Sequence, residues 1–482
     1  MITRRPGAPK LFYDGRKLLY IALDCRLHHS SRYILFDTES PEKERTHLVM
    51  EFLSAEQNDR FAATNQRFGL GAADFSAQLS ADEFAALPQT RVMASTGKSD
   101  FPSHVVAVGS IQELRALVGN DDTAVATPLL GQEPHYPEPL SDAELAGFKG
   151  LAATSLKPEI SAELADRITK AAEAYVLGDP AKVESYVEAI NALKFPGRAV
   201  VFSGDTLEIP AGATHVLTGD DPVLLNYGHI SIAPGGSLRI ETEFFINAQM
   251  FTHTPALQAM DDALGDSPAA IYITGAPWTE PAAIGAVGDP APVQTGTGTN
   301  GASHYDGGSC KNVCDTQPTN GPTGNNGGTG KTGTQGAPGR PSPAGPARLG
   351  ILTQPLTVYL GGGNGQKGGQ GGPGAPGGAG GSPGSAATGC NNSVSQGAQG
   401  KGGQGGVGGV GGPGGVSGFV SIYYTWTGPG QGVTVTVATV DGGDGGDPGV
   451  AGASASGDLG PGSQGGRGAQ GAVPQFALYN EA

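Results

Sequence analysis

Three aspartates near the end of the chain are spaced in a way that could bind a cation. Asp441, Asp444 and Asp447 stand at every third residue of a stretch in which all intervening residues are glycine. In an extended helix with three residues per turn, these carboxylates stack along one side, and carboxylate oxygens are ligands for Ca²⁺. The spacing therefore indicates either a calcium site or a row of solvated acids.

A histidine in the middle of the chain suggests a second kind of metal site. The sequence Pro210-Ala-Gly-Ala-Thr-His215 resembles the second half of the metal-binding motif of cupins, with His215 as a ligand inside a small β-barrel and His229 as a second candidate. However, Gly219 occupies the position of the motif's asparagine, and no His-x-His…Glu motif precedes it. We therefore predict no cofactor and no enzyme, and we keep a cupin-like metal enzyme in the region 199–255 as an alternative.

The four cysteines are too few for a disulfide scaffold. Cys310 and Cys314 are four residues apart, Cys390 follows later, and Cys25 is remote. A zinc site would need a second nearby pair of ligands, which the sequence lacks. One disulfide among Cys310, Cys314 and Cys390, or free thiols, remain the two main alternatives.

Glycine explains the organisation of the second half of the chain. Of 81 glycines, 22 lie in residues 1–295 and 59 in residues 296–482, whereas average usage is about 7%. The glycines keep a triplet phase through three long runs, 321–339, 362–380 and 397–418, and through two shorter ones that follow. A flexible linker has no reason to hold such a phase.

A period of three is typical of polyproline-II helices, which form no internal hydrogen bonds. Backbone groups that are buried must then find partners in neighbouring segments. Collagen fits poorly, because the runs are short and richer in Gly-Gly-X than in proline-containing triplets. We expect a folded-back bundle of polyglycine-II rods, with 400–415 in the middle, 362–382 intermediate and 321–341 at an edge.

The residues between the glycine runs carry the apolar groups that the runs lack. Ile351–Leu360, Phe419–Thr427, Val433–Val437 and Gln475–Tyr479 are strand-like and predict a β-layer that anchors the rods. These triplet runs and connectors resemble the glycine-rich sandwiches of phage long-tail-fibre tip adhesins and, more loosely, the glycine-rich domain of Obg-type GTPases. The resemblance covers the C-terminal 160 residues or so, and it implies a rigid element whose loops serve recognition.

That resemblance directs attention to the loops between rods. Cys390–Gln396 and Gly428–Gly432 are the candidate binding loops. The side chains that we expect to contact a ligand are polar or aromatic: Asn391, Asn392, Gln396, Gln431, Tyr423 and Trp426. For the last two, packing in the sheet is the alternative.

The rest of the chain predicts a multidomain protein. Residues 1–135 indicate a mixed α+β domain, with a capping box from Ser80 to Glu83 and another from Ser110 to Glu113. Residues 136–196 predict a helical hairpin, in which apolar side chains recur at the helical period. From 197 to 295 the period changes to two, which predicts short strands in a sandwich or solenoid. The glycine-rich bundle then occupies 296–482.

Charge and hydropathy argue against two classes of function, nucleic-acid binding and membrane insertion. The net charge is −16, and the basic residues do not cluster as nucleic-acid binding requires. No run of about 18 apolar residues predicts membrane insertion, and no cleaved signal peptide is obvious. We expect an extracellular or cell- or virion-surface structural protein that assembles with itself into an oligomer, filament or surface layer. The alternative is an adhesin for a glycan or protein receptor.

Overall fold

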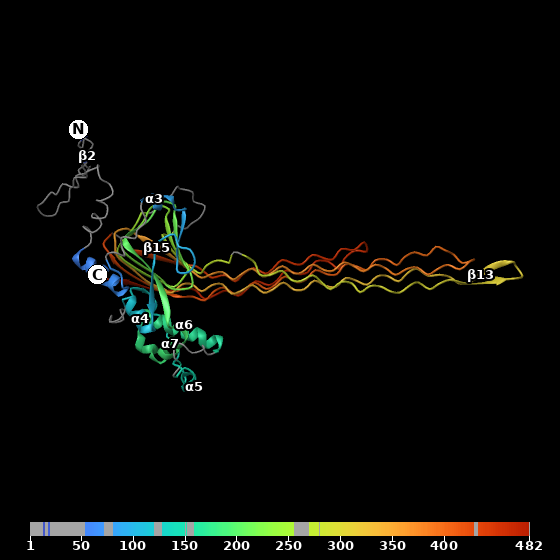
Figure 1. Cartoon of the computed structure of the whole chain (residues 1–482), viewed down its shortest axis with the longest axis horizontal. Coiled ribbons are helices and arrows are strands. Elements are labelled where there is room, and N and C mark those ends of the chain that lie inside the picture. Colours follow the sequence, from blue (N-terminus) through green and yellow to red (C-terminus); the bar gives the residue numbers. More distant parts are fainter. Residues whose placement is uncertain are drawn as a thin grey trace, which may run out of the picture.

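The computed structural model describes residues 13–14, 18–19, 54–71, 81–119, 128–149, 151, 159–254, 269–278, 280–428 and 432–481. They form a base of sheets and helices, from which a long, narrow arm extends (Figure 1). The structure is mixed, with mostly β-strands and few helices, as the sequence predicts. Cys25, Ser80 and Gln431 lie outside the described residues.

Two sheets form the base, and the chain winds between them. The eight-stranded sheet has the order β4-β6-β8-β10-β14-β16-β18-β5, and the six-stranded sheet has the order β17-β15-β11-β9-β7-β3. From β6 onward each turn of the chain adds one strand to each sheet, in parallel to the strand before it. The strands of this winding are β6 (Gly197–Ile209), β7 (Thr214–Thr218), β8 (Val223–Ile232), β9 (Ser237–Ile240), β10 (Phe244–His253), β11 (Ile271–Thr274), β14 (Gly345–Leu352), β15 (Leu356–Gly361), β16 (Phe419–Trp426), β17 (Val433–Val437) and β18 (Gln475–Asn480).

Shorter strands complete the structure. β3 (Thr90–Ala94) and β4 (His104–Val108) close one end of the two sheets, and β5 (Leu130–Gly131) pairs antiparallel with β18 at the other end. β12 (Ala302–Asp306) pairs with β13 (Lys311–Thr316), and β1 (Tyr13–Asp14) pairs with β2 (Leu18–Leu19).

Alternating side chains of the strands fill the space between the sheets. Phe202, Leu217 and Ile230 are fully buried in this inter-sheet core, because successive residues of a strand point to opposite faces. Leu207 pairs with Ile230, so the echo between these two segments, 23 residues apart in the sequence, is one turn of the winding.

Helices cover the outer face of the eight-stranded sheet (Figure 1). Ile168 of α6 and Ile190 of α7 are buried there against strand residues such as Val201 and Leu224. Ser110 caps α4 with its side chain as expected, but Glu113 accepts from the Gly109 N–H and does not close the expected capping box. Ser141 and Glu144 form a complete capping box at α5. The described helices are α2 (Ala55–Arg67), α3 (Ala81–Ala86), α4 (Ile111–Leu117), α5 (Asp142–Ala146), α6 (Ala162–Leu177), the 3₁₀ helix η2 (Pro180–Tyr186) and α7 (Val187–Lys194). Of these, α3 lies apart from the others, next to β3 of the six-stranded sheet (Figure 1).

The arm consists of three insertions into the winding. They are residues 280–342, 362–418 and 440–472, and all three leave a strand of the six-stranded sheet and return to the eight-stranded sheet. In the earlier turns the same corner is only residues 219–222 or 241–243. The strands on both sides of the expected boundary at 295/296 therefore belong to the same two sheets.

Backbone hydrogen bonds at every third residue join neighbouring segments of the arm to each other. The N–H groups of Gly403, Gly406 and Gly409 donate to carbonyls of segment 362–385 at 2.7–2.8 Å. Those of Gly405 and Gly408 donate in another direction, to segment 457–472. The third residue of each triplet, such as Val410, is exposed. The Gly-Gly-X pattern thus gives a segment two hydrogen-bonding faces and one solvent face.

The order of the segments differs in part from the expectation. Segments 362–385 and 395–418 each exchange hydrogen bonds with four others, whereas 280–301 and 457–472 bond to two. The expected edge position of 321–341 is wrong, because Gly328 donates to Asp289 and segment 280–301 covers it. An outer segment is contacted from fewer sides, so it needs fewer glycines and does not stand out in the sequence.

Candidate functional site

The far end of the arm carries a β-hairpin instead of a glycine run (Figure 1). Strands β12 and β13 pair from Ala302↔Thr316 to Asp306↔Lys311, and the tight turn between them contains Gly307 and Gly308. The Tyr305 side chain is 64% exposed, although it is large and partly apolar. Exposed aromatic residues are enriched in protein interfaces, which makes the hairpin a candidate contact surface.

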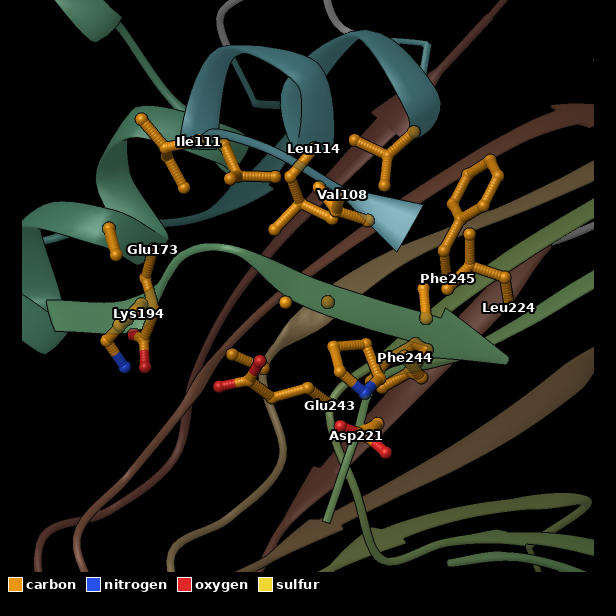
Figure 2. A pocket seen from close by; sticks show the side chains of 18 of the residues that line it. Val108, Ile111, Leu114, Glu173, Lys194, Asp221, Leu224, Glu243, Phe244 and Phe245 are labelled. Atoms are coloured by element: carbon orange, nitrogen blue, oxygen red, sulfur yellow. The ribbon is translucent and has the colours of Figure 1, made fainter. Parts of the chain in front are cut away.

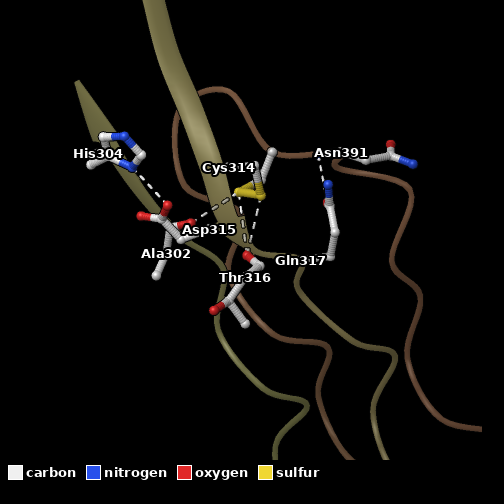
Figure 3. The surroundings of a disulfide bond; sticks show 8 residues. Ala302, His304, Cys314, Asp315, Thr316, Gln317 and Asn391 are labelled. Atoms are coloured by element: carbon white, nitrogen blue, oxygen red, sulfur yellow. Dashed lines mark hydrogen bonds and ion pairs between the residues drawn. A yellow bond between two sulfur atoms is a disulfide. The ribbon is translucent and has the colours of Figure 1, made fainter. Parts of the chain in front are cut away.

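A disulfide joins this hairpin to the loop in which the second insertion turns back toward the base. Cys314 of β13 bonds to Cys390 across a sequence separation of 76 residues (Figure 3). Of the two alternatives left open by the sequence, one disulfide or free thiols, the structure has the disulfide, between Cys314 and Cys390. Cys310 is an exposed free thiol in the hairpin turn. The two loops therefore form one covalently linked surface, which we call the tip and define as residues 302–316 and 386–396.

Polar contacts order the tip further. His304 Nδ1 lies 2.6 Å from Asp315 Oδ1, so an ion pair across the hairpin forms when the imidazole is protonated. The Asn391 N–H donates to Gln317 Oε1 at 3.0 Å (Figure 3). Asn391 Oδ1 accepts from the Ser393 N–H and hydroxyl. The carboxamide oxygen of Asn391 thus shapes its own loop.

The structure separates the predicted ligand-binding residues into two places. Asn391 and Asn392 lie on the exposed tip, and Gln396 donates through Nε2 to the Gly380 carbonyl where the loop joins its segment. Tyr423 and Trp426 lie in the base, far from the tip along the arm (Figure 1).

Tyr423 and Trp426 both have packing contacts in the base. Tyr423 stacks on Tyr479 with ring centroids 4.5 Å apart, and the Arg348 guanidinium lies 4.3 Å from its centroid. Burial raises the pKa of the Tyr423 phenol. Trp426 packs against the inter-sheet core. These contacts favour the packing alternative over a sugar-binding role.

The three predicted calcium ligands are paired with cations. Arg467 lies 3.5 Å from Asp441 and 3.7 Å from Asp444, and Lys367 lies 2.8 Å from Asp447. In the described part of the chain, no group of three or more His, Cys, Asp or Glu side chains could hold a metal ion. The row of aspartates thus forms ion pairs between neighbouring segments.

His215 and His229 lie in different sheets. His215 is in β7 and fully buried, with its ring 5.1 Å from that of Phe101, and burial together with the Arg91 charge lowers its pKa to about 3. His229 is in β8 and its Nε2 is 2.8 Å from the Thr252 hydroxyl. The strands around them are parallel, unlike the antiparallel strands of a cupin jelly roll.

Sequence reasoning missed the hairpin, which is the main element of the tip. The signal was weak, because Tyr305 and Val313 are the clear β-forming residues of 302–305 and 311–314, and they flank a turn that contains two glycines. The surrounding glycine-rich composition concealed it.

No protein-family model, curated protein or solved structure matches the chain. Within the residues that the structure describes, no helix has the length and apolar character to cross a membrane.

Proposed function

We propose that the protein is a non-enzymatic binding protein whose arm presents the tip to a glycan or protein receptor. The observation that carries this proposal is the disulfide between Cys314 and Cys390, which links the ends of two insertions at the far end of the arm. Ordering a contact surface before binding lowers the entropic cost of association. A tip that served only to reverse the chain would need neither an added hairpin nor a covalent link.

We further propose that the arm is a polyglycine-II bundle and that the winding of the base is a β-solenoid. The hydrogen bonds at every third residue and the repeated pattern of two buried glycines and one exposed residue support the first assignment. The regular addition of parallel strands to both sheets supports the second. Together they would give a stiff spacer on a rigid platform.

The chemistry of the tip supports a location outside the cell or on a cell or virion surface. Disulfides persist mainly in oxidising environments, and the Cys314–Cys390 bond lies at an exposed end of the molecule. We expect the arm to point away from the surface that holds the base.

Self-assembly is the second candidate function, and the free edge of the arm favours it. Segment 280–301 exposes Ile284, Val287 and Val293 at 65%, 58% and 84%. These side chains share one side, because they are spaced in multiples of three. Two arms could associate along this stripe into a filament.

Loop exchange tests the binding function. The purified protein is screened on an array of microbial and animal glycans and, by flow cytometry, on a panel of intact cells. A variant with 390–396 replaced by a Gly-Ser loop of equal length should lose binding, and so should Tyr305→Ala. Replacing 428–432 at the base should leave binding unchanged. If the tip variants still bind like the parent protein, the tip is not the receptor site.

The disulfide supplies a finer test on the same surface. Cys314→Ser should weaken binding because the hairpin and the loop 386–396 are no longer linked. Cys310→Ser is the matched control, since Cys310 forms no disulfide. Negative-stain microscopy of the same samples separates the two candidates: single particles with one arm support the binding function, and regular fibres support assembly.

A further inference from the structure

A cavity of 430 Å³ lies in the base, between the helices and the eight-stranded sheet (Figure 2). Its wall is largely apolar and includes Ile111, Leu114 and Val118 from the region of α4, Val176 from α6, and Leu224 and Phe245 from β8 and β10. Its size falls in the range of small-molecule sites, which are roughly 300–1,000 Å³. The cavity opens to solvent on the side of Glu243, so a small molecule could enter it.

Carboxylates dominate the polar part of the cavity. Glu173 of α6 is partly buried, and Glu243 precedes β10 at the more exposed side. Figure 2 shows Glu243 across the cavity from the apolar side chains of Ile111 and Leu114, with Glu173 beside Lys194. Asp221 also lines the cavity, but it is bound to Arg198 at 2.7 Å. Neither Glu173 nor Glu243 has an ion-pair partner among the described residues.

The charge of Glu243 disfavours ionisation of Glu173. Burial and the negative charge of Glu243 raise the pKa of Glu173 to about 8, although Lys194, Lys170 and a hydrogen bond from the Phe419 backbone act in the opposite direction. A positive charge placed beside Glu173 on the side of Glu243 would favour ionisation of Glu173 and would offset this penalty. A ligand with its own carboxylate would instead add to the repulsion.

We propose that this cavity binds a small molecule with an apolar body and one positively charged amino group. The apolar body contacts the wall formed by Ile111, Leu114 and Phe245, and the ammonium group lies at the side of Glu173 and Glu243. This site is independent of the tip, because it lies in the base and is formed by other elements.

Three matched probes test the proposal on the full chain. 2-Phenylethylamine, 2-phenylethanol and 3-phenylpropanoate share an aromatic body and differ in the charge of the head group. Isothermal titration calorimetry at pH 7 should detect binding of the amine, binding of the alcohol that is about tenfold weaker, and no binding of the acid. Equal affinity for amine and alcohol, or no binding of the amine, would overturn the proposal.

Two variants locate the ammonium group. Glu173→Gln and Glu243→Gln should each weaken the amine about tenfold while they leave the affinity for the alcohol unchanged. Glu184→Gln, an exposed position on η2 outside the cavity, is the control. Far-UV circular dichroism checks that the variants fold. If both cavity variants bind the amine like the parent protein, the carboxylates have no part in recognition and the assignment is wrong.

Discussion

The base and the arm bury their backbones by opposite means. In the base, large side chains such as Phe202 and Ile230 fill the space between two sheets that lie apart. In the arm, the segments lie so close that a Cβ on Gly409 would stand 2.0 Å from the Thr334 carbonyl oxygen. The base is thus stabilised by the packing of large side chains. The arm is stabilised by backbone hydrogen bonds between segments that can approach closely because glycine has no Cβ.

This difference makes opposite substitutions harmful in the two regions. Removing volume damages the base because a cavity remains, whereas adding volume damages the arm because the neighbouring atom is backbone and cannot turn aside. The two regions also differ in where their titratable side chains lie. The base buries His215, whereas the arm has the ion pair between Lys367 and Asp447 at its surface.

The largest effect is expected from a side chain added inside the arm. Gly409→Val should disrupt segment 395–418 and cost more than about 4 kcal/mol locally, because even its Cβ meets backbone. Hydrogen exchange should report lost protection in the arm while the base stays protected. Val410→Ala, at the neighbouring exposed position, is the control and should behave like the parent protein. Retained protection in Gly409→Val would show that the close packing is not obligatory.

A slightly smaller effect is expected from a side chain removed inside the base. Phe202→Ala should lower the free energy of unfolding by about 4 kcal/mol, and Ile230→Val by about 1 kcal/mol. Both side chains are fully buried between the sheets. Denaturant unfolding followed by circular dichroism measures both values. If both variants lose only about 1 kcal/mol of unfolding free energy, the space between the sheets closes easily, and side-chain packing is not what stabilises the base.

Acid should remove the part of the stability of the base that depends on a neutral His215. The pKa of His215 is about 3 in the folded state and 6.5 unfolded, so the unfolded chain binds the proton more tightly between these values. The contribution of His215 to stability therefore falls as the pH decreases through 6.5 and continues to fall toward pH 3. Glu173 acts in the opposite direction, because its folded pKa of about 8 lies above the ordinary value of 4.5, so its contribution rises as the pH decreases from 8 toward 4.5. The His215 contribution alone is about 2 kcal/mol between pH 7 and pH 5. His215→Leu should remove this part of the pH dependence in thermal unfolding curves, and an unchanged slope would contradict it.

The smallest effect is expected at the surface of the arm. Lys367→Ala removes the ion pair with Asp447, in which both side chains are about half exposed. Such pairs contribute between about 0 and 1 kcal/mol, so the melting temperature should barely change. A large loss would show that the ion pairs between segments, and not the backbone hydrogen bonds, hold the arm together.

The sequence predicted the arm better than the base because the two regions carry information differently. In the arm, the requirement for glycine is local, and the phase of Gly402–Gly415 marks two faces directly. In the base, β10 pairs with β14 across the whole first insertion, and nothing near either strand specifies that partner. The helical caps at Ser110 and Ser141 were predictable because each depends on residues three positions away.

The candidate site was only partly predictable for the same reason. Cys314 and Cys390 were named as disulfide candidates with Cys310, but their pairing depends on where two separate insertions end. Tyr423 and Trp426 were named as candidate ligand-binding residues with packing in the sheet as the other interpretation, and their environment is set by Arg348, Tyr479 and the inter-sheet core. Residue type indicates which interactions a side chain can form. Which neighbours it has depends on the pairing of strands and segments that are far apart in the sequence.

The third insertion reverses direction nearer to the base than the first two, whose turns are linked at the tip. The last one turns at residues 454–460, where Leu459 bonds to Gly402, while the first continues to the hairpin at 302–316. The arm is therefore thicker near its root than near its end (Figure 1). A tapered beam bends mostly where it is thin, so thermal motion would swing the last part of the arm about a nearly fixed root. The tip would then search a cap-shaped region of space at a set distance from the base.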